Sequence, residues 1–94
     1  MKLKQVSGED RGKVVLFALS TCGWCKKTKR LLNDLGVEYS YVDVDQVKEE
    51  AEKTEVVGEL KKWNPKSSFP TLVIDDESCI VGFKEDEIKK AIKK

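Results

Sequence analysis

Apolar positions along this chain form two kinds of pattern, short continuous runs and helical stripes. The first run, residues 14–19, has the length and the β-branched content of a strand buried on both faces. From residue 23 onward, apolar side chains recur every three or four positions, which predicts an amphipathic helix that ends at Gly36. The inward stripe of this helix comprises Cys25, Thr28, Leu31, Leu32 and Leu35.

A second strand is predicted within residues 37–45, where Tyr39, Tyr41 and Asp43 alternate with the residues of the other face. A helix between two strands forms a βαβ unit, so we expect parallel strands joined by a right-handed crossover. The basic residues at positions 26–30 are expected to face water.

The second half of the chain predicts a helix, a hairpin and a final helix. Residues 46–63 favour one helix, with a break near Gly58 left open, that ends at the Asn-Pro dipeptide behind it. The apolar runs 71–74 and 78–81 flank an acidic turn and predict an antiparallel hairpin. Residues 85–92 complete the pattern as a helix.

The predicted order of elements is βαβαββα, an α/β fold with a mixed four-stranded sheet flanked by three helices. Residues 1–12 are polar and predict either a loose lead-in or a short edge strand. The length of 94 residues fits one domain, 1–94.

The composition of the chain argues against several classes of function. Eighteen basic residues face 17 acidic ones, which argues against a dedicated nucleic-acid-binding protein. No apolar run approaches the ~18 residues of a membrane span. The first residues include no apolar segment typical of a secretory signal, so we expect a cytoplasmic protein without a membrane partner.

The chain has three cysteines and no histidine. Three cysteines cannot close a disulfide framework, and they cannot supply a four-ligand Cys/His zinc site within one chain, so we expect no bound metal. Redox chemistry is the economical interpretation of the motif Cys22-Gly23-Trp24-Cys25, which lies between a buried strand and an amphipathic helix.

The spacing of this motif predicts how the two cysteines divide the work. The thiolate is the nucleophile in disulfide exchange, and a helix N-terminus favours negative charge. Cys22 is expected at that position, with screened help from Lys26 and Lys27. Cys25 falls one turn inward, where its thiol can attack the Cys22 sulfur and release the reduced substrate.

Three features of the sequence, namely the cysteine motif, the basic cluster and Pro70, each allow a second interpretation. The motif alone also fits half of a metal site shared by a dimer. The basic cluster 26–30 is either a solvated helix face or a docking patch. Cys79 is expected to be a small core residue. Pro70 either marks the start of a strand or follows a cis Phe69–Pro70 bond that faces the cysteines.

Taken together, the motifs resemble the glutaredoxin family, over nearly the whole of residues 13–93. The resemblance implies a thioredoxin-like fold and a cis Pro70 beside the cysteines. It also implies that the Phe69 backbone pairs with the substrate chain as an added strand. The motifs that carry it are Ser20-Thr21-Cys22-Gly23-Trp24-Cys25, Tyr41-Val42-Asp43-Val44-Asp45, Phe69-Pro70-Thr71 and Val81-Gly82-Phe83. The substrate-binding residues it implies are Thr21, Gly23, Trp24, Ser68, Phe69, Pro70, Gly82 and Phe83.

The chain departs from the family pattern at positions that are expected to bind the charged groups of glutathione. Gly23-Trp24 replaces the common Pro-Tyr pair, Leu19 replaces a common lysine, and Val81 replaces a common glycine. The Gly82-Phe83 pair is instead similar to that of NrdH-redoxins, which resemble glutaredoxins in sequence but take electrons like thioredoxins. The resemblance therefore favours a thioredoxin-type or ferredoxin-linked reductase over glutathione as the electron donor. We expect a monomer that has no resident cofactor.

The expected function is that of a protein disulfide reductase that cycles Cys22 and Cys25 and serves cell redox homeostasis. Its partners would be disulfide-containing proteins, ribonucleotide reductase among them. The alternative is an iron–sulfur scaffold, in which Cys22 and glutathione hold a [2Fe–2S] cluster between two subunits.

Overall fold

The computed structural model describes residues 2–92, so residues 1, 93 and 94 of the predicted domain lie outside it. Its strands are β1 (Lys4–Val6), β2 (Val14–Ala18), β3 (Tyr39–Asp43), β4 (Thr71–Ile74) and β5 (Ser78–Val81). Its helices are α1 (Gly23–Leu35), the short 3₁₀ helix η1 (Val44–Gln46), α2 (Glu50–Trp63) and α3 (Glu85–Ile92).

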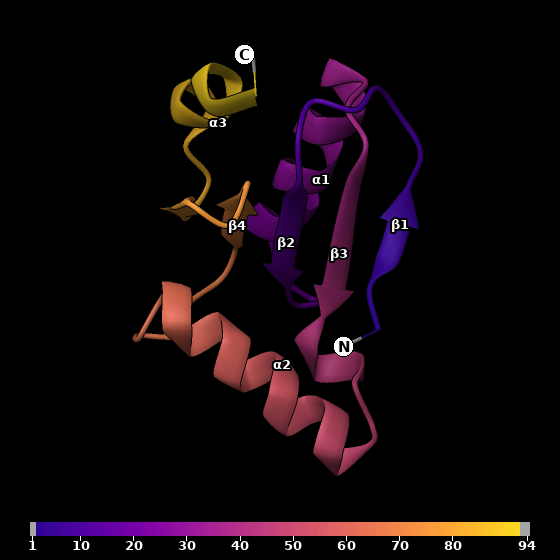
Figure 1. Ribbon diagram of the computed structural model, residues 1–94, viewed down its shortest axis with the longest axis vertical. Coiled ribbons are helices and arrows are strands. Elements are labelled where there is room, and N and C mark those ends of the chain that lie inside the picture. Colours follow the sequence, from indigo (N-terminus) through magenta and orange to yellow (C-terminus); the bar gives the residue numbers. More distant parts are fainter. Residues whose placement is uncertain (1, 93–94) are drawn as a thin grey trace.

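The strands form one mixed sheet in the order β1-β3-β2-β4-β5 (Figure 1). Strands β2 and β3 are parallel and are joined through α1, as predicted, whereas β4 pairs antiparallel with both β2 and β5. The α/β thioredoxin-like fold with three α-helices is confirmed, but the prediction of four strands was wrong. The fifth strand is β1, which pairs antiparallel with β3 and confirms the edge-strand interpretation of residues 1–12.

A close backbone contact fastens the segment that follows β1. The Glu9 N–H donates to the Gly36 carbonyl at 2.8 Å, and the Glu38 N–H donates back to the Glu9 carbonyl at 2.8 Å. A Cβ atom at Gly8 would lie 2.5 Å from the Val37 carbonyl carbon, so this approach requires glycine. The sequence pattern did not reveal this requirement, because it arises between segments far apart in the chain.

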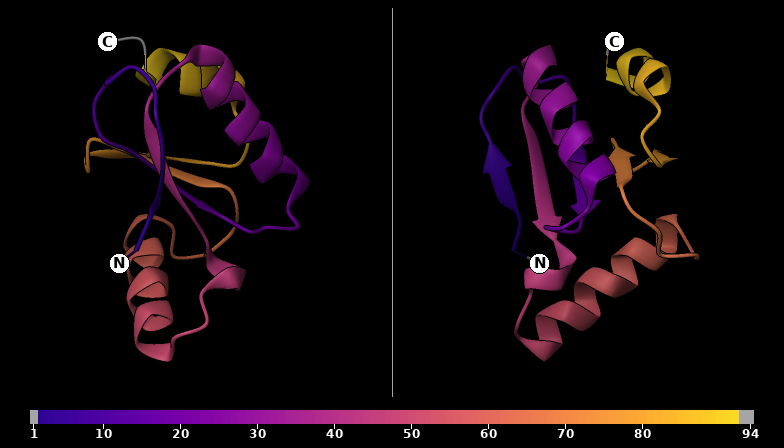
Figure 2. Two further views of the ribbon diagram at one scale, coloured as in Figure 1. Left: turned by 90° about the vertical axis from the view of Figure 1, so that its right-hand side faces the viewer. Right: turned by 180° about the vertical axis from the view of Figure 1, so that it is seen from behind.

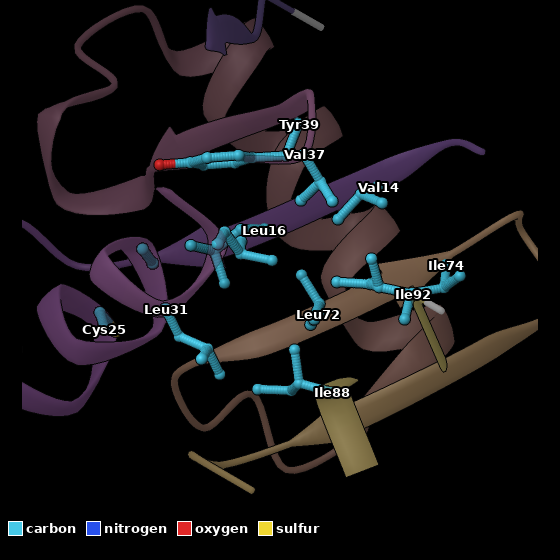
Figure 3. Packing of buried hydrophobic residues seen from close by; sticks show 12 residues of the cluster. Val14, Leu16, Cys25, Leu31, Val37, Tyr39, Leu72, Ile74, Ile88 and Ile92 are labelled. Atoms are coloured by element: carbon cyan, nitrogen blue, oxygen red, sulfur yellow. The ribbon is translucent and has the colours of Figure 1, made fainter. Parts of the chain in front are cut away.

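Helices cover both faces of the sheet, with α1 and α3 on one face and α2 on the other (Figure 2). Figure 3 shows part of the larger apolar cluster, where Leu31 of α1 and Ile88 of α3 meet Leu72 of β4. Burial of one such side chain contributes about 1.5–3 kcal/mol. Cys25 belongs to this cluster. The second cluster contains Val15, Phe17, Val42, Val44, Val56, Leu60 and Val73.

The helix boundaries follow local signals in two cases and tertiary packing in a third. Helix α1 begins directly after Cys22 and ends at Gly36, whose φ of 69° is left-handed, as predicted. Helix α2 ends before Asn64, as predicted, and it continues through Gly58. It begins at Glu50 rather than at residue 46, because the chain first turns through η1 to bury Val44.

Lys29 corrects the expectation that the whole basic cluster faces water. Its side chain is only 22% exposed, and its Nζ lies 3.1 Å from the Asp43 carboxylate of β3. The same Nζ lies 4.1 Å from the centroid of the Tyr41 ring. Lys29 therefore links α1 to β3.

Candidate redox site

Cys22 lies between β2 and α1 and caps the N-terminus of the helix. Its backbone is extended, with φ −85° and ψ 117°, and its Sγ accepts a hydrogen bond from the Cys25 N–H at 3.2 Å. This sulfur thus satisfies one of the free N–H groups at the helix end, where the helix dipole favours negative charge. The side chain is half-buried and remains accessible to a reactant.

Cys25 lies one turn further on and is completely buried. Burial and, to a smaller extent, the adjacent Cys22 side chain raise the pKa of the Cys25 thiol to about 12, against the opposing effects of the Leu19 backbone and Lys29. Cys25 therefore keeps its proton at neutral pH. The two cysteines, both free in this structure, are a half-buried sulfur at a helix N-terminus and a protonated, fully buried sulfur behind it.

A carboxylate holds the loop that precedes Cys22. Asp45 of η1 accepts hydrogen bonds from both the backbone N–H and the hydroxyl of Ser20, the former at 2.8 Å. The Gln46 amide donates to the Ser20 Oγ at 3.1 Å and to the Asp45 carboxylate at 3.2 Å. These bonds lower the pKa of Asp45 to about 2, the Ser20 hydroxyl contributing most. We call Asp45, Ser20 and Gln46 the carboxylate clamp.

A buried amide holds the second loop of the site. The Asn64 Nδ2 donates to the Ser68 carbonyl at 3.2 Å, to the Ser68 Oγ at 3.0 Å and to the Thr71 Oγ1 at 3.0 Å. The Thr71 hydroxyl donates in turn to the Ser68 carbonyl at 2.9 Å. Asn64 and Thr71 are both buried. We call Asn64, Ser68 and Thr71 the amide clamp.

The amide clamp leads directly into the Phe69–Pro70 bond, which is cis as the family resemblance implied. Pro70 is buried, and its carbonyl accepts the Gly82 N–H at 2.8 Å. Gly82 has a φ of 86°, a conformation that glycine adopts without a Cβ penalty. This bond brings the loop after β5 against the loop before β4.

Five of the predicted substrate-binding residues meet in one groove of about 210 Å³, and they are Trp24, Phe69, Pro70, Gly82 and Phe83. The rings of Trp24 and Phe83 stack with centroids 5.8 Å apart. A larger hollow of about 420 Å³ lies elsewhere, beside β1 and η1, and none of the predicted catalytic or binding residues lines it, whereas Trp24 of the groove stands between the two cysteines in the chain. The groove, and not this larger hollow, is therefore the candidate binding surface.

Three other predicted binding residues lie outside the lining of the groove. Thr21 is exposed in the loop before Cys22, and the side chain of Ser68 serves the amide clamp. Nothing lies within 4 Å of the position that a Cβ atom at Gly23 would take, so the fold itself does not demand glycine there. The open space beside Cys22 leaves the cluster-bridged dimer a prediction.

The sequence analysis missed Asp45 and Asn64 as site residues. Asp45 belongs to a motif that served only for the resemblance, and Asn64 served only as a helix end. A chemical signal was available for Asn64, since Asn at the end of a helix commonly bonds to nearby backbone, but none was available for Asp45, whose partner Ser20 lies 25 residues away.

Cys79 is separate from the pair. It lies on β5, and its Sγ donates to the Trp63 carbonyl at 3.2 Å while its side chain packs on the α2 face. Within residues 2–92 no group of three or more His, Cys, Asp or Glu side chains is arranged to hold a metal ion. In the same part of the chain, no helix has the length and apolarity to span a membrane.

A cysteine pair at the junction of a central strand and a helix, whose intervening Trp24 lines one groove with a cis-proline, is typical of a thiol redox protein of thioredoxin fold. Comparisons with known proteins narrow this class. The Glutaredoxin family profile matches residues 14–79. A glutaredoxin-like 8.6 kDa protein of Clostridium pasteurianum is 34% identical over 82 residues, which cover 86% of this chain and 99% of that protein.

Two archaeal crystal structures are more similar. The glutaredoxin from Methanosarcina mazei is 52% identical with a TM-score of 0.90, and the match covers 100% of this chain and 90% of that one. The methanoredoxin of Methanosarcina acetivorans is 51% identical with a TM-score of 0.90, and the match covers 100% and 97% of the two chains. The chain belongs to the glutaredoxin family, whose members are thiol–disulfide oxidoreductases, and it carries their redox-active Cys-x-x-Cys pair.

Proposed function

We propose that this glutaredoxin-like protein reduces disulfides of partner proteins, with Cys22 as the attacking nucleophile and Cys25 as the resolving thiol. The observation that carries the proposal is the contrast between the two sulfurs. The Cys22 Sγ is accessible and accepts a helix N-terminal N–H, whereas Cys25 is buried and its pKa is raised to about 12.

The exchange proceeds in two steps. The Cys22 thiolate attacks one sulfur of the partner disulfide, whose other sulfur leaves as a thiolate and takes a proton from water. The Cys25 thiol then attacks the Cys22 sulfur, forms the Cys22–Cys25 disulfide and passes its proton to the second partner sulfur as it leaves. Two electrons move from this protein to the partner, and both partner sulfurs end as thiols.

The groove favours an extended segment of a partner protein as the substrate. Phe69 of the loop before β4 lines the groove, where its backbone would pair with a partner chain as an added strand. Ribonucleotide reductase remains one candidate partner among disulfide-containing proteins.

The electron donor is proposed to be a thioredoxin-type or ferredoxin-linked reductase. Leu19 is half-buried and packs on the α2-facing cluster, so the position where glutathione-using relatives commonly carry a lysine contributes packing instead of charge. Reduction of the oxidised protein by such a reductase, followed by alkylation and mass measurement, should outpace reduction by glutathione with glutathione reductase. Faster reduction by glutathione would contradict this part of the proposal.

Insulin disulfide reduction tests the assignment of the two cysteines. Cys22→Ser should lose the activity, and Cys25→Ser should accumulate a mixed disulfide with the substrate, detectable by mass. Cys79→Ser is the matched control, because Cys79 lies on the other face of the sheet, and it should retain full activity. Activity in Cys22→Ser, or a trapped adduct on Cys25 instead of Cys22, would overturn the assignment.

A further inference from the structure

The exposed face of α1 carries a group of cations without acidic partners. Lys26, Lys27 and Arg30 are all exposed, and none forms an ion pair with any residue in the range 2–92 that the structure describes. The fourth cation of this segment, Lys29, is accounted for by Asp43. We call Lys26, Lys27 and Arg30 the cationic patch.

The cationic patch does not reflect a high net positive charge of the whole protein. The formal net charge is only +1. Elsewhere on the surface, several cations lie beside acidic side chains, as in the pairs Lys13–Asp76, Lys62–Glu59, Lys84–Glu87 and Lys89–Glu85. The first two turns of α1 contain no acidic residue. On α2, by contrast, the lysines share the helix with Glu50, Glu52, Glu55 and Glu59, so a run of cations without an intervening acid distinguishes α1 from α2.

The cationic patch adjoins the attacking sulfur. Cys22 caps α1, and Lys26 and Arg30 follow it by four and eight positions, which places them on one stripe about 6 and 12 Å along the helix axis. The Lys26 N–H donates to the Cys22 carbonyl at 3.1 Å. A protein that brings a disulfide to the Cys22 Sγ must therefore come close to this stripe.

An exposed aromatic ring joins the patch to the groove. The Lys27 Nζ lies 4.4 Å from the centroid of the Trp24 ring. Trp24 is 57% exposed, the one large apolar side chain so exposed among the described residues, and it stacks on Phe83 at the groove. Through Trp24, the cationic patch thus adjoins the groove.

We propose that the cationic patch docks the acidic side of a disulfide-bearing protein, so that Asp or Glu residues flank the cysteine that Cys22 attacks. The inference rests on the proposed function and adds the chemistry of its partner. Opposite charge on the partner speeds encounter and orients the disulfide toward Cys22, while like charge opposes docking. Exchange with such a partner should weaken as salt screens the surface charges.

The test uses two disulfide-bearing peptides of equal length, one with glutamates and one with lysines beside the cystine. The measured quantity is the ratio of their kcat/KM values, which cancels any change in thiol reactivity within one variant. The wild-type ratio should favour the acidic peptide at low salt. The double variant Lys26→Glu, Arg30→Glu should lower the ratio about tenfold, because two attractions become repulsions.

The matched control is Lys53→Glu, Lys61→Glu on α2, which makes the same change in net charge at two exposed lysines away from the cysteines. It should leave the ratio unchanged. Equal ratios in the wild type and the α1 variant would overturn the docking proposal, and so would an equal drop in the control. A single-stranded oligonucleotide that competes with the acidic peptide and loses binding in the α1 variant would assign the patch to nucleic acid, which also overturns it.

A neutral substrate separates this proposal from the proposed function. Wild-type protein that reduces 2-hydroxyethyl disulfide and both peptides at matched rates would retain the reductase function and refute the docking surface. Wild-type protein that reduces none of them would refute the reductase function, and the docking surface with it.

Discussion

Two polar clamps hold the loops that meet at the dithiol, and they use opposite chemistry. The carboxylate clamp, centred on Asp45, holds the loop before Cys22 at the surface. The amide clamp, centred on the buried Asn64, holds the loop before Pro70. A buried charge costs far more than a buried neutral group with satisfied hydrogen bonds, so the ion stands where water reaches it.

The two loops of the site differ in the conditions to which they respond. The loop that carries Cys22 depends on an ionised group and is sensitive to pH. The loop that carries the cis-proline depends on neutral hydrogen bonds and close packing. Breaking each clamp in turn should therefore produce different signatures.

The largest effect is expected for Asn64→Ala. The substitution removes the three hydrogen bonds donated by the Asn64 amide, so the buried Thr71 Oγ1 loses its donor and only the Thr71 hydroxyl still donates to the Ser68 carbonyl. The free energy of unfolding should fall by about 1–3 kcal/mol. Urea unfolding followed by circular dichroism measures it, with the exposed Thr54→Ala as the control that changes little. An equal effect of both substitutions would show that the amide clamp contributes nothing.

Thr71→Val should have a smaller effect. Valine keeps the shape but loses the Oγ1 that accepts from Asn64 and donates to the Ser68 carbonyl. We expect a loss of about 1 kcal/mol in the same unfolding experiment. The double variant with Asn64→Ala should lose less than the sum of the single losses, since both remove the same bond. Strict additivity would contradict a shared clamp.

Asp45→Asn should act on rate more than on stability. The amide nitrogen cannot accept the Ser20 hydroxyl, so the loop before Cys22 is held less firmly. Insulin reduction should slow by roughly two- to fivefold, on the scale of an exposed charged contact. Glu50→Gln, on an exposed acidic residue at the start of α2, is the matched control. An unchanged rate in Asp45→Asn would show that the carboxylate clamp does not position Cys22.

The smallest expected effect is a loss of stability at acid pH. The folded pKa of Asp45 is lowered from 3.8 to about 2, so its contribution to stability is complete above pH 3.8 and is lost as the pH falls through about 2. Wild type and Asp45→Asn should converge in urea midpoint as the pH falls from 5 to 2. Asn64→Ala should show no such convergence, because its clamp does not titrate. A difference between wild type and Asp45→Asn that persists at pH 2 would contradict the ionic origin of the carboxylate clamp.

Most of the fold was predictable because its signals are local. The hairpin strands β4 and β5 and the helix α3 have the predicted bounds, and Gly36 ends α1 as expected. The start of α2 was not predictable, since burial of Val44 overrides the helical pattern of the residues before Glu50. Strand β1 was left open because its pairing partner, β3, lies more than 30 residues away.

The chemistry of the site could be predicted from the sequence, because the three-residue spacing from Cys22 to Cys25 on one helical turn places one sulfur outward and the other inward. Motifs shared with a family predicted the five residues that line the groove, together with three that do not. The interactions that hold the site together became visible only in the folded molecule. Asp45 with Ser20, and Asn64 with Thr71, are joined by hydrogen bonds whose geometry depends on how the whole sheet folds. Such bonds leave no periodic trace in the chain, because each is made by single polar groups that meet only after the core has packed.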